Sequence, residues 1–157
     1  VYGHTEDSGF FYDECFGTVY NRFVVQAVLE RPLTVYGTGE QMRSFININN
    51  SIQAIDLLIN NPPNSGEYRI VQQLTELYTI NQIAEMVSKL TGAKIDYYAN
   101  PRIEMKSNKF KFEASKLKTL GLQTVPMSHE LPKTIKMVQE HKDKIIPSII
   151  EPKTKWK

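Results

Sequence analysis

The chain has 157 residues and a mass of 18.1 kDa, which is enough for one domain with a sizeable core. No apolar run approaches the roughly 20 residues of a membrane-spanning helix, so we expect no membrane insertion. Cys15 is the single cysteine, which excludes an internal disulfide and predicts a soluble protein of the reducing cytoplasm. The opening Val1-Tyr2-Gly3 has neither a start methionine nor a signal-peptide pattern, so the sequence reads as part of a longer protein.

Charge is unevenly distributed along the chain. Residues 1–88 contain no lysine, four arginines and ten acidic residues, a net charge of −6. Residues 89–157 contain fourteen lysines, one arginine and seven acidic residues, a net charge of +8. A basic segment can attract nucleic acid, but these lysines are dispersed and accompany no nucleic-acid-binding motif. We therefore interpret them as solvated helix faces and a loose tail, and expect no nucleic-acid partner.

The first part of the chain alternates between helical and strand patterns. In order, it predicts a helix at 17–31 ended by Pro32, strands at 33–36 and 43–48 around a turn at 37–39, and a helix from Asn50 or Ser51 to residue 60. The last of these helices has apolar residues at helical spacing, which we expect to face inward. They are Ile52, Ile55, Leu58 and Ile59.

The alternation continues to the end of the chain. Thr79 and Gln82 have the spacing of a capping box, and Gly92 is placed to end the helix that they begin. The other predicted elements are strands at 67–72, at 94–98 and near 109–112, and helices at 114–120 and 128–142. Such alternation is typical of an α/β fold. We predict one domain over 1–144 and a tail over 145–157.

The sequence lacks several well-known catalytic and cofactor motifs. Gly37 and Gly39 match two glycines of a dinucleotide-binding fingerprint, but Met42 stands in the third position and a strand is predicted next instead of a helix. The three histidines are scattered, so no metal site is predicted. No serine lies in a nucleophile elbow. The chain therefore contains no catalytic set of its own.

Two arginines lie in settings that suit anion binding. Arg43 begins a predicted strand after the glycine turn, and Arg102 lies in a proline loop after another strand. Two guanidinium groups that converge from separate loops can hold a diphosphate in bidentate fashion. The alternative at this point is that each arginine makes a surface salt bridge.

The segment from Pro32 to Ile48 resembles a hallmark of the extended short-chain dehydrogenases, the NAD-dependent nucleotide-sugar epimerases and dehydratases. Their pattern runs P-L-x-V-Y-G-x-G-x-Q-x-R-D-F-I-x-V, and Ser44 stands where it has an aspartate. Further stretches resemble the sulfolipid branch of that family, the UDP-sulfoquinovose synthases. They are Tyr12-Asp13, Phe16-Gly17-Thr18, Asn21-Arg22-Phe23, Gln26-Ala27, Gly66 to Arg69, Gln73 to Glu76, Asn100 to Glu104, Lys116-Leu117, Leu120-Gly121-Leu122, Ile146-Pro147-Ser148 and Trp156.

The resemblance implies that this chain is the C-terminal, substrate-binding part of a Rossmann-type enzyme. The glycine fingerprint and the Tyr-x-x-x-Lys pair of the family's NAD-binding half do not occur in it. NAD would be bound mainly by that other half, so we expect no cofactor and no turnover for this chain alone. The full-length enzyme would form a homodimer. Segments near residues 50–72 would pack on the NAD-binding half, which predicts an exposed apolar surface without it.

The resemblance also implies roles for six residues in binding a UDP-sugar, with UDP-glucose as the expected substrate and sulfite as co-substrate. Tyr36 would flank the uracil, and Asn21 would hydrogen-bond the diphosphate. Arg43 and Arg102 would grip the two phosphates, with Gln41 and Thr18 near the sugar or nucleotide. Two alternatives remain open: a nucleotide-binding module without catalysis, and another UDP-sugar 4-epimerase or dehydratase.

Overall fold

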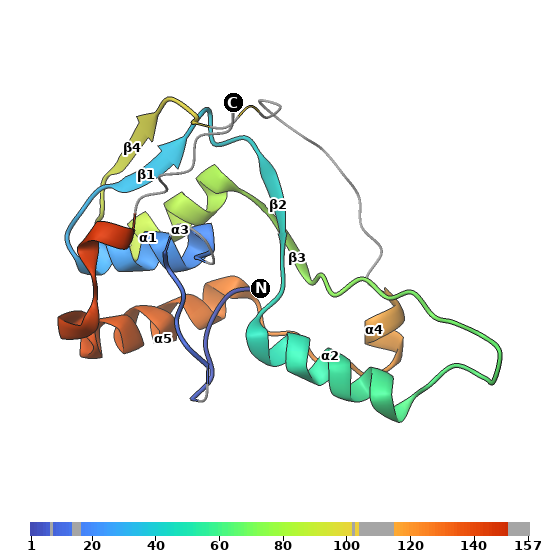
Figure 1. The fold of residues 1–157 in the computed structure, drawn as a ribbon. Coiled ribbons are helices and arrows are strands. Elements are labelled where there is room, and N and C mark those ends of the chain that lie inside the picture. Colours follow the sequence, from blue (N-terminus) through green and yellow to red (C-terminus); the bar gives the residue numbers. More distant parts are fainter. Residues whose placement is uncertain (7, 14–16, 102, 104–114, 151–157) are drawn as a thin grey trace.

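The computed structural model describes residues 1–6, 8–13, 17–101, 103 and 115–150. Its helices and strands alternate along the chain, which confirms the α/β class (Figure 1). In order they are α1 (Val19–Val28), β1 (Leu33–Tyr36), β2 (Met42–Phe45), α2 (Ile48–Asn60), β3 (Glu76–Thr79), α3 (Ile80–Thr91), β4 (Ile95–Tyr98), α4 (Ser115–Thr119) and α5 (Met127–Glu140), followed by 3-10 turns at Lys142–Lys144 and Pro147–Ile149.

The strands form two separate pairs. β1 and β4 are parallel, with Leu33 opposite Ile95 and Tyr36 opposite Tyr98. β2 and β3 are antiparallel and form a long ribbon that leads away from the main body toward α2 and α4 (Figure 1). The N-terminal segment lies beside the end of β2 that leads into α2, since Tyr2 forms a parallel bridge to Asn47. The glycine turn therefore connects two strands that belong to different pairs.

The main core lies between α1, α3, α5 and β1. α1 is buried on nearly all sides, and Tyr20, Phe23 and Val24 have no exposed surface. A second, smaller cluster of Ala54, Leu117 and Leu122 holds α4 against α2. Because α1 itself is buried on nearly all sides, it holds the side chains at its N-terminal end in place.

The capping predictions for α3 are confirmed. The Thr79 hydroxyl accepts the Gln82 backbone N–H at 3.2 Å, and the Gln82 side chain accepts the Thr79 backbone N–H at 2.8 Å. Gly92 ends the helix in the left-handed conformation, with φ 73°. α2 begins earlier than predicted, because Asn47 rather than Asn50 or Ser51 caps it.

The predicted strand at 67–72 is wrong. This segment is irregular, and the strand of this region lies at 76–79, where it pairs with β2. A β-prone run forms a strand only where a partner strand lies alongside it, and within the described residues only 76–79 meets β2. Tyr68 and Ile70 remain 85% and 70% exposed.

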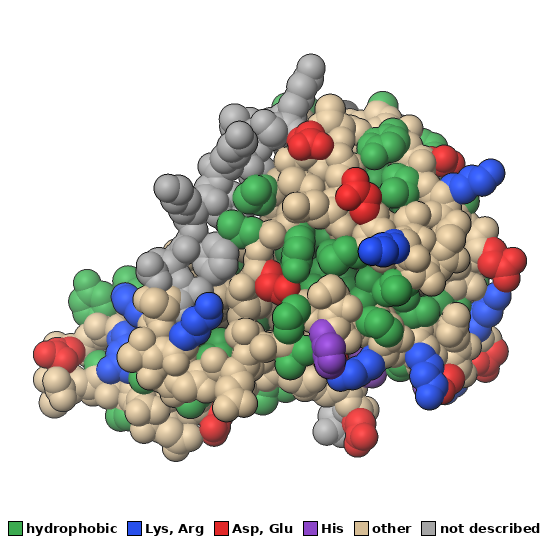
Figure 2. Space-filling model, turned by 180° about the vertical axis from the view of Figure 1, so that it is seen from behind, with side chains coloured by type: hydrophobic (Ala, Val, Ile, Leu, Met, Phe, Trp, Pro, Cys, Tyr) green, Lys and Arg blue, Asp and Glu red, His purple; other side chains and the backbone are tan. Residues whose placement is uncertain are grey.

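The prediction that four apolar residues of α2 face inward is also wrong for three of them. Ile52, Ile55 and Ile59 are exposed, and only Leu58 is partly buried against the small cluster. The resemblance had implied an exposed apolar surface over this region, and the structure shows one. Apolar side chains reach the surface among polar ones where α2 and α4 project, at the left of Figure 2.

The end of the chain differs from expectation as well. α5 begins at Met127, one residue before the predicted start, and the segment after it returns to the core, where Ile150 is 1% exposed. The predicted strand near 109–112 and residues 151–157 lie outside the described residues.

Candidate functional site

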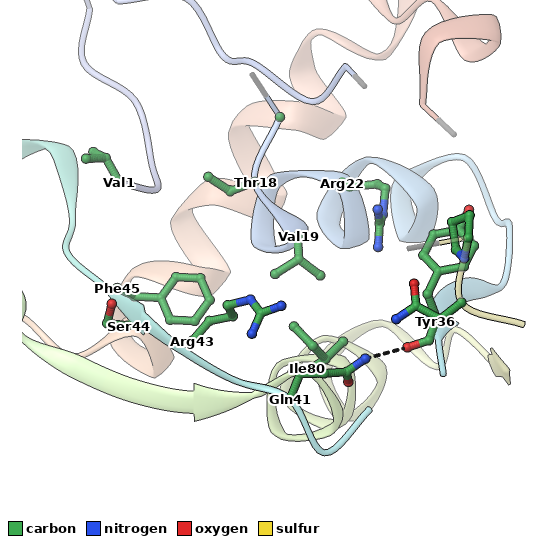
Figure 3. A pocket seen from close by; sticks show the side chains of 13 residues that line it. Val1, Thr18, Val19, Arg22, Tyr36, Gln41, Arg43, Ser44, Phe45 and Ile80 are labelled. Carbon is green, nitrogen blue, oxygen red and sulfur yellow. Dashed lines mark hydrogen bonds between the residues drawn. The ribbon is translucent and has the colours of Figure 1, made fainter. Parts of the chain in front are cut away.

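A cavity of about 290 Å³ opens where the N-terminal end of α1, the end of β1, the strand β2 and the loop after β4 meet (Figure 3). Its polar and aromatic lining comes from segments far apart in the sequence. These residues are Thr18, Arg22, Tyr36, Gln41, Arg43, Ser44 and Asn100. Val19, Phe45 and Ile80 supply an apolar part of the wall. The cavity therefore combines aromatic, apolar and cationic groups, as nucleotide sites do.

The glycine turn shapes one wall of the cavity. Gly37 and Gly39 have φ of 72° and 74°, values that other residues rarely adopt. The buried Gln41 side chain donates its amide N–H to the Tyr36 carbonyl at 3.0 Å and so closes the turn (Figure 3). The Asn81 backbone N–H donates to the Gly39 carbonyl at 3.0 Å, which ties the turn to the start of α3. Tyr36 and Gln41 are thereby held in fixed positions.

Two arginines reach into the cavity from different elements (Figure 3). Arg43 extends from β2, and its guanidinium donates to the Met42 carbonyl at 3.1 Å. Arg22 extends from α1 and donates to the Thr34 carbonyl at 3.2 Å. Its guanidinium carbon lies 5.2 Å from the centre of the Tyr36 ring, within cation–π range.

The electrostatic character of the cavity favours an anion. Among its described lining residues, both charged side chains are those of arginines. Gly17, Thr18 and Val19 also line it at the N-terminal end of α1, where the helix dipole adds partial positive charge. A phosphorylated ligand matches this arrangement better than a neutral or cationic ligand.

The structure brings together four of the six residues that the sequence analysis selected. Thr18, Tyr36, Gln41 and Arg43 line the cavity. Arg102 lies outside the described residues, although its neighbours Asn100 and Pro101 line the cavity.

Asn21 is not among the lining residues and is 4% exposed. Its amide donates to the Phe11 carbonyl at 2.8 Å, so it anchors the segment that precedes α1. The third residue of a helix that is buried on nearly all sides points inward, which the sequence pattern alone did not reveal.

Arg22 lines the cavity, although the sequence analysis assigned it no role. The signal was present, because Arg22 lies four positions after Thr18 and helix residues at that spacing share a face. In the sequence analysis, Arg22 appears only within the stretch Asn21-Arg22-Phe23.

The three tyrosines whose pKa values are raised, Tyr2, Tyr20 and Tyr78, are not among the residues that line this cavity. Burial raises the pKa of Tyr78 to about 12, and its hydrogen bond to Glu76 adds to the shift. Burial also raises the pKa values of Tyr2 and Tyr20 above their ordinary range. The Tyr2 hydroxyl donates to Glu76 at 3.1 Å and the Tyr20 hydroxyl donates to Thr134 at 3.0 Å, so these buried phenols connect elements that are distant in sequence.

The described part of the chain contains no group of three or more His, Cys, Asp or Glu residues that could hold a metal ion. No described helix is long and apolar enough to cross a membrane.

Known proteins match the chain along most of its length. It is 40% identical over 159 aligned positions to a UDP-sulfoquinovose synthase of Sulfolobus acidocaldarius, covering 94% of this chain and 40% of that protein. It is 36% identical to the chloroplastic UDP-sulfoquinovose synthase of Spinacia oleracea, covering 94% of this chain and 32% of the other. The chain thus spans less than half the length of these relatives. No family model matches it.

Solved structures share the fold. A UDP-glucuronic acid 4-epimerase from Bacillus cereus, in complex with UDP-glucuronic acid and NAD, aligns with a TM-score of 0.65 and 25% identity, covering 79% of this chain and 40% of that one. A UDP-glucose 4-epimerase from Thermotoga maritima with UDP-glucose aligns with a TM-score of 0.67 and 18% identity. The alignment covers 88% of this chain and 44% of that one. Over almost its whole length the chain is homologous to UDP-sulfoquinovose synthases, and it belongs to the extended short-chain dehydrogenase family of nucleotide-sugar enzymes.

Proposed function

We propose that this chain forms the UDP-binding, C-terminal part of an NAD-dependent enzyme of the UDP-sulfoquinovose synthase type. The observation that carries the proposal is the convergence of Tyr36, Gln41 and Arg43 with Thr18 on one cationic cavity. An aromatic ring beside the cavity suits a nucleobase, and a guanidinium suits a diphosphate. The relatives that match the chain are named as enzymes of UDP-sugars.

The described residues do not fit NAD itself. The Gly37–Gly39 turn leads into β2, whereas a dinucleotide fold needs a helix N-terminus directly after its glycines. Asn81 also occupies the space next to Gly39, where a pyrophosphate would have to approach. We infer that NAD and the catalytic groups belong to a part of the enzyme outside these residues, and that this chain alone does not turn over substrate.

The chain would contribute to catalysis through binding energy. Contacts to the UDP lie away from the reacting sugar carbons, and such remote contacts serve to orient the sugar for reaction. Arg43 would hold a phosphate, Tyr36 the uracil, and Thr18 and Gln41 the neighbouring part of the nucleotide. UDP-glucose and sulfite are the proposed substrates, and a homodimer the proposed assembly of the whole enzyme.

Calorimetric titration of the protein in its natural length with UDP and UDP-glucose tests the binding role. Binding of both, with no binding of free glucose, supports it, and failure to bind UDP overturns it. Incubation with NAD, UDP-glucose and sulfite then separates the alternatives. A sulfonated UDP-sugar supports the synthase assignment. Conversion without sulfite indicates a different epimerase or dehydratase, and UDP binding without any conversion indicates a non-catalytic module.

A further inference from the structure

Arg22 has a more constrained environment than a surface arginine. Its guanidinium folds back over two aromatic rings, with the central carbon 5.2 Å from the Tyr36 centroid and 5.4 Å from the Phe23 centroid. One of its N–H groups donates to the Thr34 carbonyl at 3.2 Å. Long cationic side chains usually extend toward water, so this conformation depends on the fold around it.

The anchor of Arg22 is itself rigid. Thr34 is 7% exposed, and Gln26 makes two hydrogen bonds to it. The Gln26 amide donates to the Thr34 hydroxyl at 2.8 Å, and the Thr34 backbone N–H donates to the Gln26 side-chain oxygen at 3.1 Å. The carbonyl that receives Arg22 therefore has a fixed position. A guanidinium held in this way loses little conformational entropy when it binds a ligand.

Arg22 extends from α1 into the cavity that Arg43 enters from β2 (Figure 3). Two guanidinium groups that line one cavity from different elements can bind the oxygens of one diphosphate. On the basis of the UDP site proposed above, we propose that Arg22 is a phosphate-binding residue and forms a two-arginine clamp with Arg43. The clamp then consists of residues from α1 and β2, without requiring the loop that contains Arg102.

The contact between Arg22 and Tyr36 also fits a second role. Arg22 could act only as a positioning residue that holds the Tyr36 ring in place for a nucleobase. The two roles differ in which part of the ligand they affect. Loss of a phosphate contact weakens UDP but leaves uridine unchanged, whereas a displaced Tyr36 weakens uridine and UDP by the same factor.

NMR titrations of the protein in its natural length with uridine, UMP and UDP distinguish these roles. In Arg22→Gln, we expect UDP to bind about tenfold more weakly or worse, because a charge-assisted hydrogen bond is lost, with uridine affinity unchanged within about twofold. Arg22→Lys keeps the charge and should recover part of the loss for UDP. The control Arg31→Gln removes an exposed arginine outside the cavity and should bind all three ligands as the wild type does.

Equal weakening of uridine and UDP in Arg22→Gln, or no weakening of UDP, would overturn the phosphate role. If Arg22→Gln does not fold, Arg22→Lys decides: the phosphate role requires weaker UDP binding with unchanged uridine binding, and any other pattern contradicts it. Inorganic pyrophosphate separates this inference from the proposed function. If the wild type binds pyrophosphate in an Arg22-dependent way but not UDP, the nucleotide site fails and the anion clamp stands. If it binds neither, both fail.

Discussion

Glu76 caps helix α5 from a different element, because both of its carboxylate oxygens accept the Met127 backbone N–H, at 2.9 and 3.1 Å. Helix α5 needs such a partner, since its N-cap residue is Pro126, which provides no side-chain hydrogen bond. The same carboxylate accepts the hydroxyls of Tyr2 and Tyr78. One side chain of β3 thus joins the N-terminal segment, the β2–β3 ribbon and α5, and holds the ribbon that carries Arg43.

Glu76→Gln is expected to destabilise the protein by about 1.5–3 kcal/mol, the usual contribution of a hydrogen bond to a charged group. The neutral amide lacks the negative charge that stabilises a helix N-terminus and offers one acceptor where the carboxylate offers two. Urea unfolding measures the change in the free energy of unfolding. Glu85→Gln on the exposed side of α3 is the matched control and should change it little. Equal stability of Glu76→Gln and the wild type would contradict the capping role.

Stability should fall at alkaline pH partly because of Tyr78. Its pKa is raised from 10.0 to about 12, so the folded protein holds the phenolic proton more tightly than the unfolded chain does. The contribution of Tyr78 is therefore fully present below about pH 10 and is lost as the pH rises toward 12. In Tyr78→Phe, the slope of unfolding free energy between these values should be shallower. At pH 7, the difference in unfolding free energy between Tyr78→Phe and the wild type measures the lost hydrogen bond separately. An unchanged slope between pH 10 and 12 would contradict the role of Tyr78 in the alkaline loss of stability.

Gly39→Ala should destabilise the protein more than Gly66→Ala. Both glycines have a positive φ, 74° and 82°, so both substitutions carry similar backbone strain. A methyl group at Gly39 would overlap the Asn81 side chain, whereas one at Gly66 meets nothing within 4 Å. Asn81 cannot turn away freely, because its amide donates to the Thr38 carbonyl and the Glu40 carboxylate. Thermal unfolding should show an additional loss of about 1–3 kcal/mol at Gly39, the typical cost of overpacking.

The role proposed for Arg43 predicts that Arg43→Ala weakens UDP binding about tenfold or more, in line with a lost charge-assisted contact. The effect should decrease at high salt, because the partly exposed charge is screened. Isothermal titration at two salt concentrations measures both. Arg69→Ala removes an exposed arginine whose side chain bonds only to the Asn61 carbonyl among the described contacts, and it should leave UDP affinity intact. Unchanged affinity in Arg43→Ala would remove this residue from the site.

The exposed isoleucines of α2 should make the 157-residue chain self-associate when it is studied by itself. Ile52, Ile55 and Ile59 are 52%, 49% and 71% exposed, and they share one face of the helix. Replacing all three by serine should give a monomer in light scattering at concentrations where the unaltered chain is larger. Leu90→Ser, a similarly exposed residue on α3, should not change the mass. A monomeric unaltered chain would contradict the prediction.

Local spacing was sufficient to predict several elements. The capping box at Thr79 and Gln82 and the end of α3 at Gly92 depend on contacts within a few residues, so the sequence predicts them. The motif from Pro32 to Ile48 likewise indicated Tyr36, Gln41 and Arg43, and these three share a cavity.

The sequence by itself determined the α/β class, the family and most helix ends, because all three are encoded in neighbouring residues. Only the tertiary structure decided that residues 76–79, and not 67–72, pair with β2. It also decided that the Asn21 side chain is buried and that Arg22 lines the same cavity as Arg43. The physical reason is the same each time: a strand needs a partner, and a side chain's direction depends on what packs around its helix. Both are supplied by segments distant along the chain.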